Sequence, residues 1–362
     1  MRRVTLFIGS LSGGGAERVT CNLANYLNEN GYNIDVLTMS NKRDAYKLDS
    51  EIKRINLLDE KELKGRIKNI RIRMRRLKEY VKKNQDVSCY IVMLPVTIFM
   101  LIRLKRLTKS KIIISERNNP SSYKLYEKLI MKYSARKCDG LVVQTKEIGS
   151  WYKNVKNKIV IPNAVNKDIV FPKRGKIEKK IVSVSRLEKQ KNIPMLIDAF
   201  EKFQTEYPDY KLEIYGKGSL EKKLKSEVKK RKLDDKIVFM EYVNNVAEKI
   251  ANAACFVLTS NHEGIPNALI EAMCIGIPCI ATESDGGGVK SLIIDGENGV
   301  LIQKGDVASL ALSMKKIIKD NKYSDSISKK AKLLRKKLSY NNIYEKWAYL
   351  VEKIINNEGI AR

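Results

Sequence analysis

Residues 4–38 read VTLFIGSLSGGGAERVTCNLANYLNENGYNIDVLT and place two short β-branched runs on either side of a helical pattern. The first run, Val4–Ile8, leads into a glycine-rich loop. The second, Asn33–Thr38, follows an amphipathic stretch at Glu17–Asn28. A strand, a crossover helix and a second strand make a βαβ unit with parallel strands. The segment therefore predicts an α/β fold built on a parallel sheet.

The same alternation continues on both sides of a charged segment at 172–180, which we interpret as a linker. The first half has further strand-like runs at 88–93, 111–115, 140–144 and 158–162. The second half has strand-like runs at 181–185, 211–215, 237–239, 255–259, 278–282 and 299–302, and helical patterns at 194–206, 220–231, 266–274 and 307–318. Two facing, doubly wound halves are expected, with a ligand cleft outside the carboxyl ends of their strands.

Composition narrows the class of protein. The 362 residues carry 70 Lys+Arg against 41 Asp+Glu, a net charge of +29, which favours an anionic partner or reflects biased codon usage. Six cysteines without a Cys-x-x-Cys pair and a single histidine, His262, exclude a Cys/His zinc site. The longest weakly charged apolar run, 90–102, is too short to cross a bilayer, and no signal peptide is evident, so a cytosolic chain is expected.

The glycine-rich loop Gly9-Ser10-Leu11-Ser12-Gly13-Gly14-Gly15 precedes the first expected helix. Glycines there let the backbone approach a phosphate or sugar at the helix N-terminus. The loop matches neither G-x-G-x-x-G nor G-x-x-x-x-G-K-[ST], so a dinucleotide site and a P-loop are disfavoured. A tight packing turn without a ligand is the alternative interpretation.

Charged residues follow two expected strands of the second half. Arg186 ends the strand at 181–185, and Lys191 lies five residues later. Two fixed cations suit a leaving nucleoside diphosphate, although basic residues near a strand end are usually solvated. After the strand at 255–259, Glu263 lies in a loop and Glu271 in the second turn of the next helix. Because apolar neighbours surround Glu271, its carboxylate needs a partner, such as a ribose diol.

The combination of motifs resembles glycosyltransferase family 4, whose members have the GT-B fold and retain the anomeric configuration. The resemblance covers nearly the whole chain. In chain order, it rests on the N-terminal Gly-Gly-Gly-Ala-Glu-Arg, Ser185-Arg186-Leu187 to Lys191-Asn192, Tyr215-Gly216-Lys217-Gly218, Glu263-x7-Glu271 and Asp295-Gly296-Glu297-Asn298-Gly299. It is closest to bacterial enzymes that build capsule, O-antigen or lipid-linked oligosaccharides.

The resemblance implies a role for each of these residues. Arg186 and Lys191 would hold the nucleotide diphosphate, Glu271 the ribose, and Glu263 the donor sugar and the positive charge at its anomeric carbon. The backbone of Ile265, Pro266 and Asn267 would contact the donor, and Gly14 and Gly15 would approach the reaction centre. The implied domains are residues 1–168 for the acceptor, residues 169–340 for the nucleotide sugar, and a C-terminal helix in 341–362 that packs back on the first domain.

The resemblance also implies a metal-independent reaction with no cofactor, in which a nucleotide sugar, most plausibly UDP-linked, is the co-substrate. No two aspartates in the chain are separated by one residue, as an Asp-x-Asp metal motif would require. The chain departs from the family after the strand at 111–115, where many members have a histidine and this sequence has Glu116. Glu116 is therefore a candidate catalytic residue on the acceptor side.

The segment 61–83 contains eleven Lys/Arg and two Glu, and an apolar stripe repeats along it at steps of three and four. Such an amphipathic basic helix predicts docking on an anionic membrane at the cytosolic face, next to a polyprenyl-diphosphate-linked saccharide acceptor. Alternatively, the stripe packs on the sheet and the basic face is solvated.

Two other functions stay open. One is a nucleotide-sugar epimerase of related architecture. The other is a nucleic-acid-binding protein, which is disfavoured because no stacking platform or recognition motif is evident.

Overall fold

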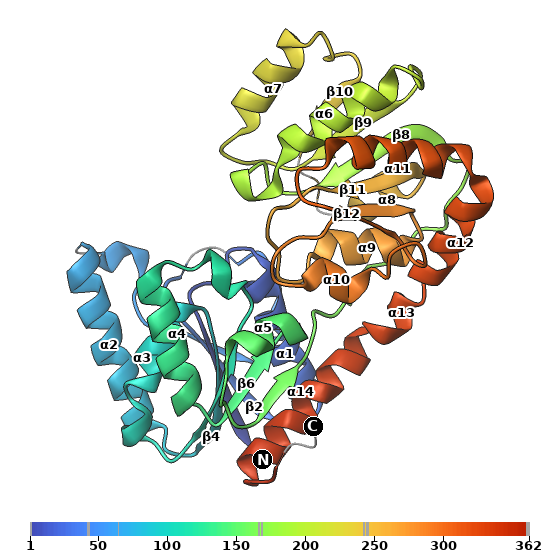
Figure 1. The fold of residues 1–362 in the computed structure, drawn as a ribbon. Helices are drawn as coiled ribbons and strands as arrows, with labels where there is room; N and C mark the ends of the chain where they lie inside the picture. Colours follow the sequence, from blue (N-terminus) through green and yellow to red (C-terminus); the bar gives the residue numbers. More distant parts are fainter. Residues whose placement is uncertain are drawn as a thin grey trace. The chain divides into compact units, whose positions relative to one another are not determined.

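The structure, a computed structural model, describes residues 2–41, 44–63, 65–165, 167, 169–241, 243 and 246–359. The chain divides into two compact units. One contains residues 1–164 and 341–362, and the other contains residues 165–340. Each unit has its own parallel sheet with helices on both faces (Figure 1). This confirms the predicted α/β class with two Rossmann-like halves.

The first unit has a seven-stranded sheet in the order β3-β2-β1-β4-β5-β6-β7. Its strands are β1 (Arg3–Ile8), β2 (Asn33–Thr38), β3 (Lys53–Asn56), β4 (Val87–Met93), β5 (Lys111–Ser115), β6 (Gly140–Val143) and β7 (Lys158–Val160). Sequence reasoning missed β3, because its sequence KRIN shows neither an apolar run nor burial and the strand lies at the edge of the sheet. The order reverses between β1 and β4, which creates a topological switch point.

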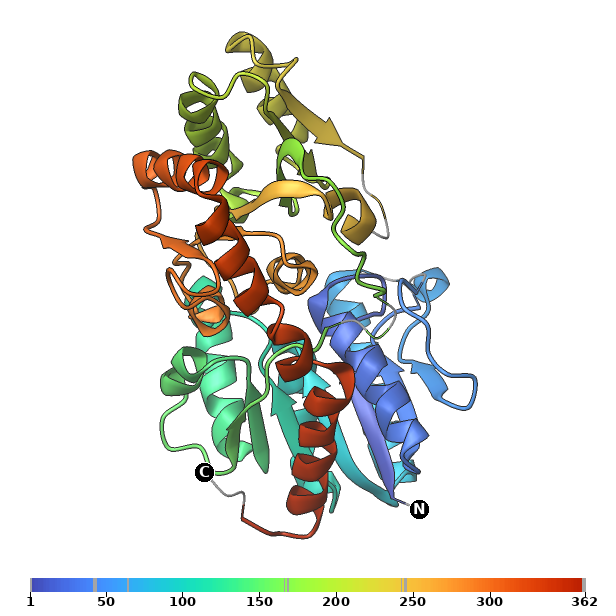
Figure 2. The same ribbon diagram turned by 90° about the vertical axis from the view of Figure 1, so that its right-hand side faces the viewer.

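Helices cover both faces of this sheet (Figure 1). They are α1 (Gly15–Glu29), α2 (Arg66–Lys83), α3 (Pro95–Ile102), α4 (Leu125–Lys137), α5 (Lys146–Trp151) and α14 (Tyr340–Ile355), with 3₁₀ turns η1 (Glu60–Glu62), η2 (Lys105–Leu107) and η3 (Pro120–Ser122). Side chains of α2, α3, α4 and α5 share one apolar cluster with the sheet. On the other side, α14 lies along α1, with the rings of Tyr26 and Tyr344 5.8 Å apart (Figure 2).

The basic segment 61–83 is not one helix. Helix α2 begins only at Arg66, because Gly65 has a φ of 102°, and residues 60–62 form the separate turn η1. The apolar stripe also divides: Leu77 and Val81 are buried against the sheet, whereas Leu63, Ile67 and Ile70 are exposed. Packing on the sheet therefore accounts for the second half of the stripe but not for the first.

The second unit has a six-stranded sheet in the order β10-β9-β8-β11-β12-β13, which again reverses once, between β8 and β11. The strands are β8 (Glu178–Val184), β9 (Lys211–Tyr215), β10 (Ile237–Met240), β11 (Ala253–Leu258), β12 (Cys279–Thr282) and β13 (Val300–Ile302). All of these strands were predicted to within three residues at each end. The apolar runs are short, and β11 and β12 are buried at every residue, as expected for the inner strands of a parallel sheet covered on both faces.

The helices of this unit are α6 (Ile193–Gln204), α7 (Glu221–Lys230), α8 (Val246–Ile250), α9 (Asn267–Ile275), α10 (Gly288–Leu292), α11 (Val307–Lys319), α12 (Asn321–Ala331) and α13 (Leu334–Lys337), with the 3₁₀ turn η4 (Lys189–Lys191). One apolar cluster joins α6, α7 and α11 to the sheet. Helices α8, α12 and α13 contact α9. The helices over 321–337 were not predicted, because Lys and Ser dominate that stretch.

The charged segment at 172–180 is part of the second unit rather than a loose linker. The Arg174 guanidinium donates hydrogen bonds to the backbone carbonyls of Ala251, Ala253 and Gly276, at 3.0, 2.6 and 2.7 Å. These three bonds fix the chain just before β8 begins at Glu178.

The helices and the cysteines of the described chain bear on two properties, membrane spanning and thiol reactivity. Among the described residues, no helix is long and apolar enough to span a bilayer. All six cysteines are free thiols, five of them buried, and burial raises the pKa of Cys21, Cys138 and Cys274 to about 12. Thiols of raised pKa are poor nucleophiles at neutral pH.

Candidate donor site in the second unit

The switch point of the second sheet brings together two loops that are far apart in the sequence. Strands β8 and β11 are neighbours, and their crossover connections leave in opposite directions. The loop after β8 carries Arg186 and Lys191, and the loop after β11 carries Glu263. The topology therefore collects the predicted charged residues at the edge where ligands bind in such sheets.

Lys191 and Glu263 form an ion pair between the Nζ and Oε1 atoms. Only 13% of the Lys191 side chain and 8% of the Glu263 side chain are exposed. Taking two charges out of water costs several kcal/mol per ion, at an order of magnitude, so the pair persists only because each charge neutralises the other. An ammonium group has three donors, so Lys191 can hold this carboxylate and an anionic ligand together.

Gln190, which sequence reasoning missed, ties the two loops together. The side-chain Nε2 of Gln190 donates to the backbone carbonyl of His262 at 2.7 Å. The backbone carbonyl of Gln190 accepts from the Asn261 N–H at 2.9 Å. Next to it, the Thr259 hydroxyl donates to the carbonyl of Lys191 at 2.9 Å. These bonds fix the position of Lys191 relative to Glu263. In the sequence, the only indication of the role of Gln190 was its position between the predicted cations Arg186 and Lys191.

Arg186 differs from Lys191 in having an exposed guanidinium. Its Nη2 donates a long hydrogen bond of 3.5 Å to Gln190 Oε1, and it has no ion-pair partner among the described residues. A hydrogen bond of this length is weak. The guanidinium is thus available to an anion at the carboxyl end of β8.

Glycines let backbones approach closely on both sides of these loops. A Cβ on Gly216, whose φ is +141°, would lie 1.9 Å from the carbonyl oxygen of Ser185, directly before Arg186. A Cβ on Gly288 would lie 1.3 Å from the carbonyl oxygen of Gly264, directly after Glu263. Both contacts require glycine. Gly216 belongs to a motif quoted above, whereas Gly288 was not identified from the sequence.

Three serine hydroxyls at the same edge have no hydrogen-bond partner among the described residues. Ser185, Ser260 and Ser284 follow β8, β11 and β12, and their Oγ atoms are shielded from solvent. A buried hydroxyl without a partner costs about 1–3 kcal/mol. Such unsatisfied groups beside Arg186 and Glu263 are suited to a polar ligand or to ordered water. Serine is too common in strand-to-helix loops to have indicated them from the sequence.

The segment after Glu263 leads into α9. Ile265 and Pro266 are buried, and the helix begins at Asn267, with Pro266 at the N-cap. Glu271 lies one turn further on and is half-buried. The predicted helix start and the position of Glu271 in its second turn are thus confirmed, while the ligand role of Glu271 stays a prediction.

The glycine loop of the first unit lies at the carboxyl end of β1. Gly13 and Gly14 have φ values of 121° and 137°, and Gly14 is the N-cap of α1. Gly14 and Gly15 are exposed, and the Tyr46 hydroxyl donates to the Gly14 carbonyl at 3.2 Å. A Cβ on Gly14 would lie 2.4 Å from Oε2 of Glu17, whose pKa is raised by burial. The loop therefore presents an open backbone.

Glu116 is held inside the first unit. Its Oε1 accepts from the Tyr123 hydroxyl at 2.7 Å and from the Asn118 N–H at 3.0 Å, and its Oε2 accepts from the Tyr152 hydroxyl. Burial raises the pKa of this carboxyl above its ordinary value. Both oxygens are thus occupied by groups that organise the loop after β5. This geometry fits a residue that positions the loop.

The neighbouring Arg117 is also buried. Its guanidinium donates to Ser115 Oγ at 2.7 Å and to Asn163 Oδ1 at 3.2 Å, and it lies 5.3 Å from the ring of Trp347. Burial lowers its pKa to about 10. Arg117 therefore joins the loop after β5 to α14.

Among the described residues, no group of three or more His, Cys, Asp or Glu side chains could hold a metal ion.

Comparison with known proteins identifies the family. Residues 13–169 match the model of Glycosyltransferase Family 4, and residues 166–334 match that of Glycosyl transferases group 1. A Campylobacter jejuni protein named GalNAc-alpha-(1->4)-GalNAc-alpha-(1->3)-diNAcBac-PP-undecaprenol alpha-1,4-N-acetyl-D-galactosaminyltransferase is 26% identical over 98% of this chain and 100% of its own. An uncharacterized glycosyltransferase of Haemophilus influenzae is 27% identical over 96% of this chain and 99% of its own.

Solved structures show the same fold. Sucrose-phosphate synthase from Thermosynechococcus elongatus has a TM-score of 0.83 at 16% identity, covering 99% of this chain and 100% of its own. Anabaena HepE, solved in complex with UDP and glucose, has a TM-score of 0.81 at 14% identity, covering 98% of this chain and 100% of its own. The chain therefore belongs to the GT-B glycosyltransferases, with a family 4 region in its first half and a group 1 region in its second.

Proposed function

We propose that the protein transfers a sugar from a nucleotide sugar, UDP-linked, to a polyprenyl-diphosphate-linked saccharide, with retention of anomeric configuration and without a metal or cofactor. The acceptor class is supported by two Campylobacter jejuni relatives named for undecaprenol-linked substrates, 26% and 27% identical to this chain. The donor is supported by similar folds solved with UDP. The observation that carries the proposal is the buried Lys191–Glu263 pair beside Arg186.

The charges at this edge fit the needs of the leaving group. As the bond between the anomeric carbon and the diphosphate oxygen breaks, negative charge grows on the diphosphate and positive charge on the sugar ring. Arg186 and Lys191 stabilise the negative charge on the diphosphate, and Glu263 stabilises the positive charge on the sugar ring. These groups are in place before the bond breaks. Glu271 accepts hydrogen bonds from the ribose, and the backbone at Ile265, Pro266 and Asn267 contacts the donor sugar and phosphate.

Retention follows from attack on the face that the diphosphate leaves. The acceptor hydroxyl oxygen forms the new bond to the anomeric carbon, the diphosphate departs with the electron pair of the broken bond, and its phosphate oxygen takes the acceptor proton. No protein base is then needed, which agrees with Glu116 being buried and fully engaged. The open backbone of Gly14 and Gly15 serves the acceptor side.

We place the protein on the cytosolic face of the cell membrane through exposed residues between Lys61 and Arg71, in η1 and at the start of α2. Leu63, Ile67 and Ile70 expose their side chains, and Lys61, Lys68 and Arg71 are exposed around them. Apolar side chains flanked by cations are typical of a segment that lies in the interface of an anionic bilayer. This location would bring the enzyme to a lipid-linked acceptor.

The test is nucleoside diphosphate release from a panel of nucleotide sugars, with and without a bacterial lipid extract. Release from one donor that requires lipid, and that falls at least a hundredfold in Glu263→Gln and in Arg186→Gln, is expected. Lys222→Gln, an exposed lysine of α7, is the matched control and should keep full activity. Conversion of the donor without any acceptor would indicate an epimerase instead, and no turnover of any donor would overturn the transferase.

A further inference from the structure

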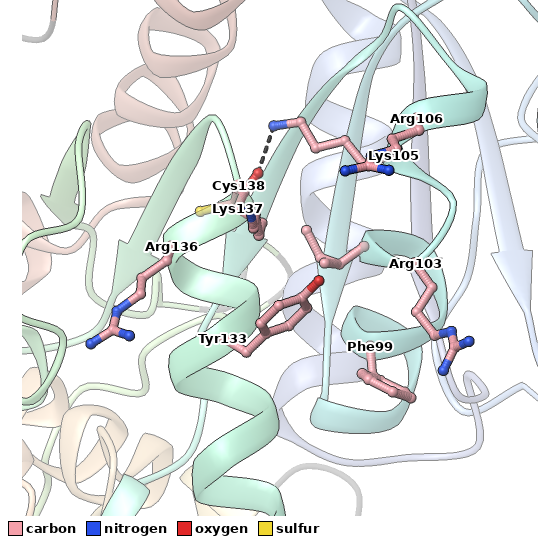
Figure 3. A pocket seen from close by; sticks show the side chains of 9 residues that line it. Phe99, Arg103, Lys105, Arg106, Tyr133, Arg136, Lys137 and Cys138 are labelled. Carbon is pink, nitrogen blue, oxygen red and sulfur yellow. Dashed lines mark hydrogen bonds between the residues drawn. The ribbon is translucent and has the colours of Figure 1, made fainter.

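A groove of about 1050 Å³ lies in the first unit between α3 and α4. Its lining residues are Phe99, Ile102, Arg103, Lys105, Arg106, Tyr133, Arg136, Lys137 and Cys138. Figure 3 shows Tyr133 reaching from α4 toward α3, Lys105 reaching across from η2, and Arg103 beside Phe99 on α3. The proposed transferase mechanism uses none of these residues.

The lining is strongly basic and contains no acidic residue. Lys105 is neutralised by Asp139, 2.9 Å away, and also donates to the Lys137 carbonyl at 2.6 Å. Arg103 lies 5.5 Å from the centre of the Phe99 ring. The four remaining cations of the groove have no ion-pair partner within the part of the chain that the structure describes: Arg103, Arg106, Arg136 and Lys137. Figure 3 shows Arg136 pointing away from α3, which leaves Arg103, Arg106 and Lys137 as the uncompensated cations of the groove. Such cations attract an anion that accepts several hydrogen bonds, such as a phosphate group.

The groove is far from the acceptor edge of the same sheet. Its residues belong to the carboxyl-terminal parts of α3 and α4 and to η2, which directly precede β5 and β6. The glycine loop follows β1, and Glu116 follows β5. Because all strands of this sheet are parallel, the starts of β5 and β6 lie at the opposite edge from these loops. A ligand in the groove is therefore distinct from an acceptor bound at the glycine loop or beside Glu116.

An exposed apolar helix face adjoins the groove. Leu125, Leu129 and Tyr133 lie four residues apart on α4, so they share one face, and they are 75%, 62% and 51% exposed. Tyr133 belongs both to this face and to the groove. A contiguous exposed apolar face on a soluble domain usually marks an interaction site. A free phosphate would satisfy the cations but would leave this face without a role.

We propose that the groove between α3 and α4 binds the phosphate group of an anionic phospholipid, while the exposed face of α4 contacts the apolar part of the same lipid surface. The inference deepens the proposed membrane association, on which it rests, and adds a lipid site that is separate from α2. Basic groups around the phosphate and apolar groups beside it match the two parts of one lipid, which is the argument for this occupant.

The test uses dihexanoyl-phosphatidylglycerol below its critical micelle concentration, titrated by calorimetry against dihexanoyl-phosphatidylcholine and inorganic phosphate. The wild-type protein should bind the phosphatidylglycerol and should bind neither the phosphatidylcholine nor inorganic phosphate. Arg103→Gln/Arg106→Gln should weaken this binding by about thirtyfold, since each Lys or Arg near an anionic lipid contributes about fivefold. The control Lys47→Gln/Lys346→Gln removes two positive charges beside α1 and on α14, and it should leave the binding of phosphatidylglycerol unchanged.

The opposite results are equally clear. Equal weakening in the two double variants would show a general charge effect and overturn the site, as would undetectable binding of the phosphatidylglycerol. Equally tight binding of inorganic phosphate would overturn the lipid as the occupant.

Failure of the proposed function is read from separate measurements. Loss of nucleotide-sugar turnover with intact lipid binding would reject the transferase and leave the groove. Vesicle binding that survives substitution of the exposed α2 residues but is lost in Arg103→Gln/Arg106→Gln would reject only the role of α2.

Discussion

Lys191 and Glu263, 72 residues apart in the chain, form an ion pair at the switch point of the second sheet. Lys191 ends the turn η4, and Glu263 lies in the loop after β11. The pair exists because β8 and β11 are neighbours, and Gln190 connects the two loops through the backbone of Asn261 and His262. A buried pair placed at the ligand-binding edge of a sheet links the stability of the loops to the chemistry of the site.

A double-mutant cycle on this pair separates its contribution to stability from its contribution to activity. Lys191→Met should lower the free energy of unfolding by about 3 kcal/mol, because it leaves the buried Glu263 charge without a partner. Lys191→Met/Glu263→Gln should recover part of that loss, with a coupling of about 0.5–3 kcal/mol, while activity stays at least a hundredfold reduced in both. Urea titration and nucleotide release are the measurements. Recovery of activity in the double variant would contradict a direct role for these side chains.

Gly288→Ala tests the close approach beside Glu263. The new Cβ would lie 1.3 Å from the backbone oxygen of Gly264, so the loop must shift, and we expect a stability loss of about 1–3 kcal/mol together with weaker donor binding. Gly175→Ala is the control, since its Cβ would meet nothing nearer than 3.5 Å. Thermal melting and nucleotide-sugar titration of the two variants measure the difference. Equal behaviour would show that the loop accommodates a side chain.

Glu116→Gln gives a stability difference that depends on pH. Burial raises the pKa of the Glu116 carboxyl in the folded state, so the fold holds a proton that the unfolded chain releases. The contribution of this group to stability is therefore greatest at low pH and falls as pH rises above the ordinary pKa of about 4.3. Glutamine does not titrate, so the stability of the variant relative to wild type should increase as pH rises above the ordinary pKa of a glutamate. A pH-independent difference in urea midpoints would contradict the raised pKa.

Substitution of Leu63, Ile67 and Ile70 by serine tests the membrane role of the start of α2 and of Leu63, which directly follows η1. The three side chains are exposed, so stability should change little, whereas binding to phosphatidylglycerol vesicles should weaken by at least tenfold. The control replaces three exposed apolar residues of the second unit, Val170, Leu312 and Leu333, by serine. Sedimentation with vesicles at low salt measures both. Equal loss in the control would indicate nonspecific adhesion.

Arg186→Gln is expected to act on the donor without affecting folding. The guanidinium is exposed and makes only a 3.5 Å hydrogen bond to Gln190 within the described residues, so the melting temperature should stay within about 2 °C of wild type. The affinity for the nucleoside diphosphate should fall by about tenfold or more, since a hydrogen bond to a charged group contributes about 1.5–3 kcal/mol. Calorimetric titration with the diphosphate measures it. Unchanged affinity would remove Arg186 from the donor site.

The local features of this protein follow from its sequence. The buried parallel strand Lys111–Ser115 appears as a continuous run of isoleucines, and its predicted bounds agree with the structure. The bounds predicted for Lys211–Tyr215 also agree. The edge strand β3 is absent from that pattern because an edge strand need not be apolar. The amphipathic period of 61–83 indicated one helix, but the observed helix begins only at Arg66, after Gly65.

What only the tertiary structure decided is how residues distant in the chain meet. Sequence motifs indicated Arg186, Lys191 and Glu263 separately, whereas their assembly depends on the strand order of the second sheet. Gln190, Gly288 and the three unsatisfied serines carry no signal of their own, since their roles come from a neighbouring backbone or from burial. The stripe on 61–83 shows the same limit: its period predicts an apolar face, but only packing determines that Leu77 is buried and Ile67 is exposed. Periodicity is a local property of the chain, whereas burial is a property of the whole fold.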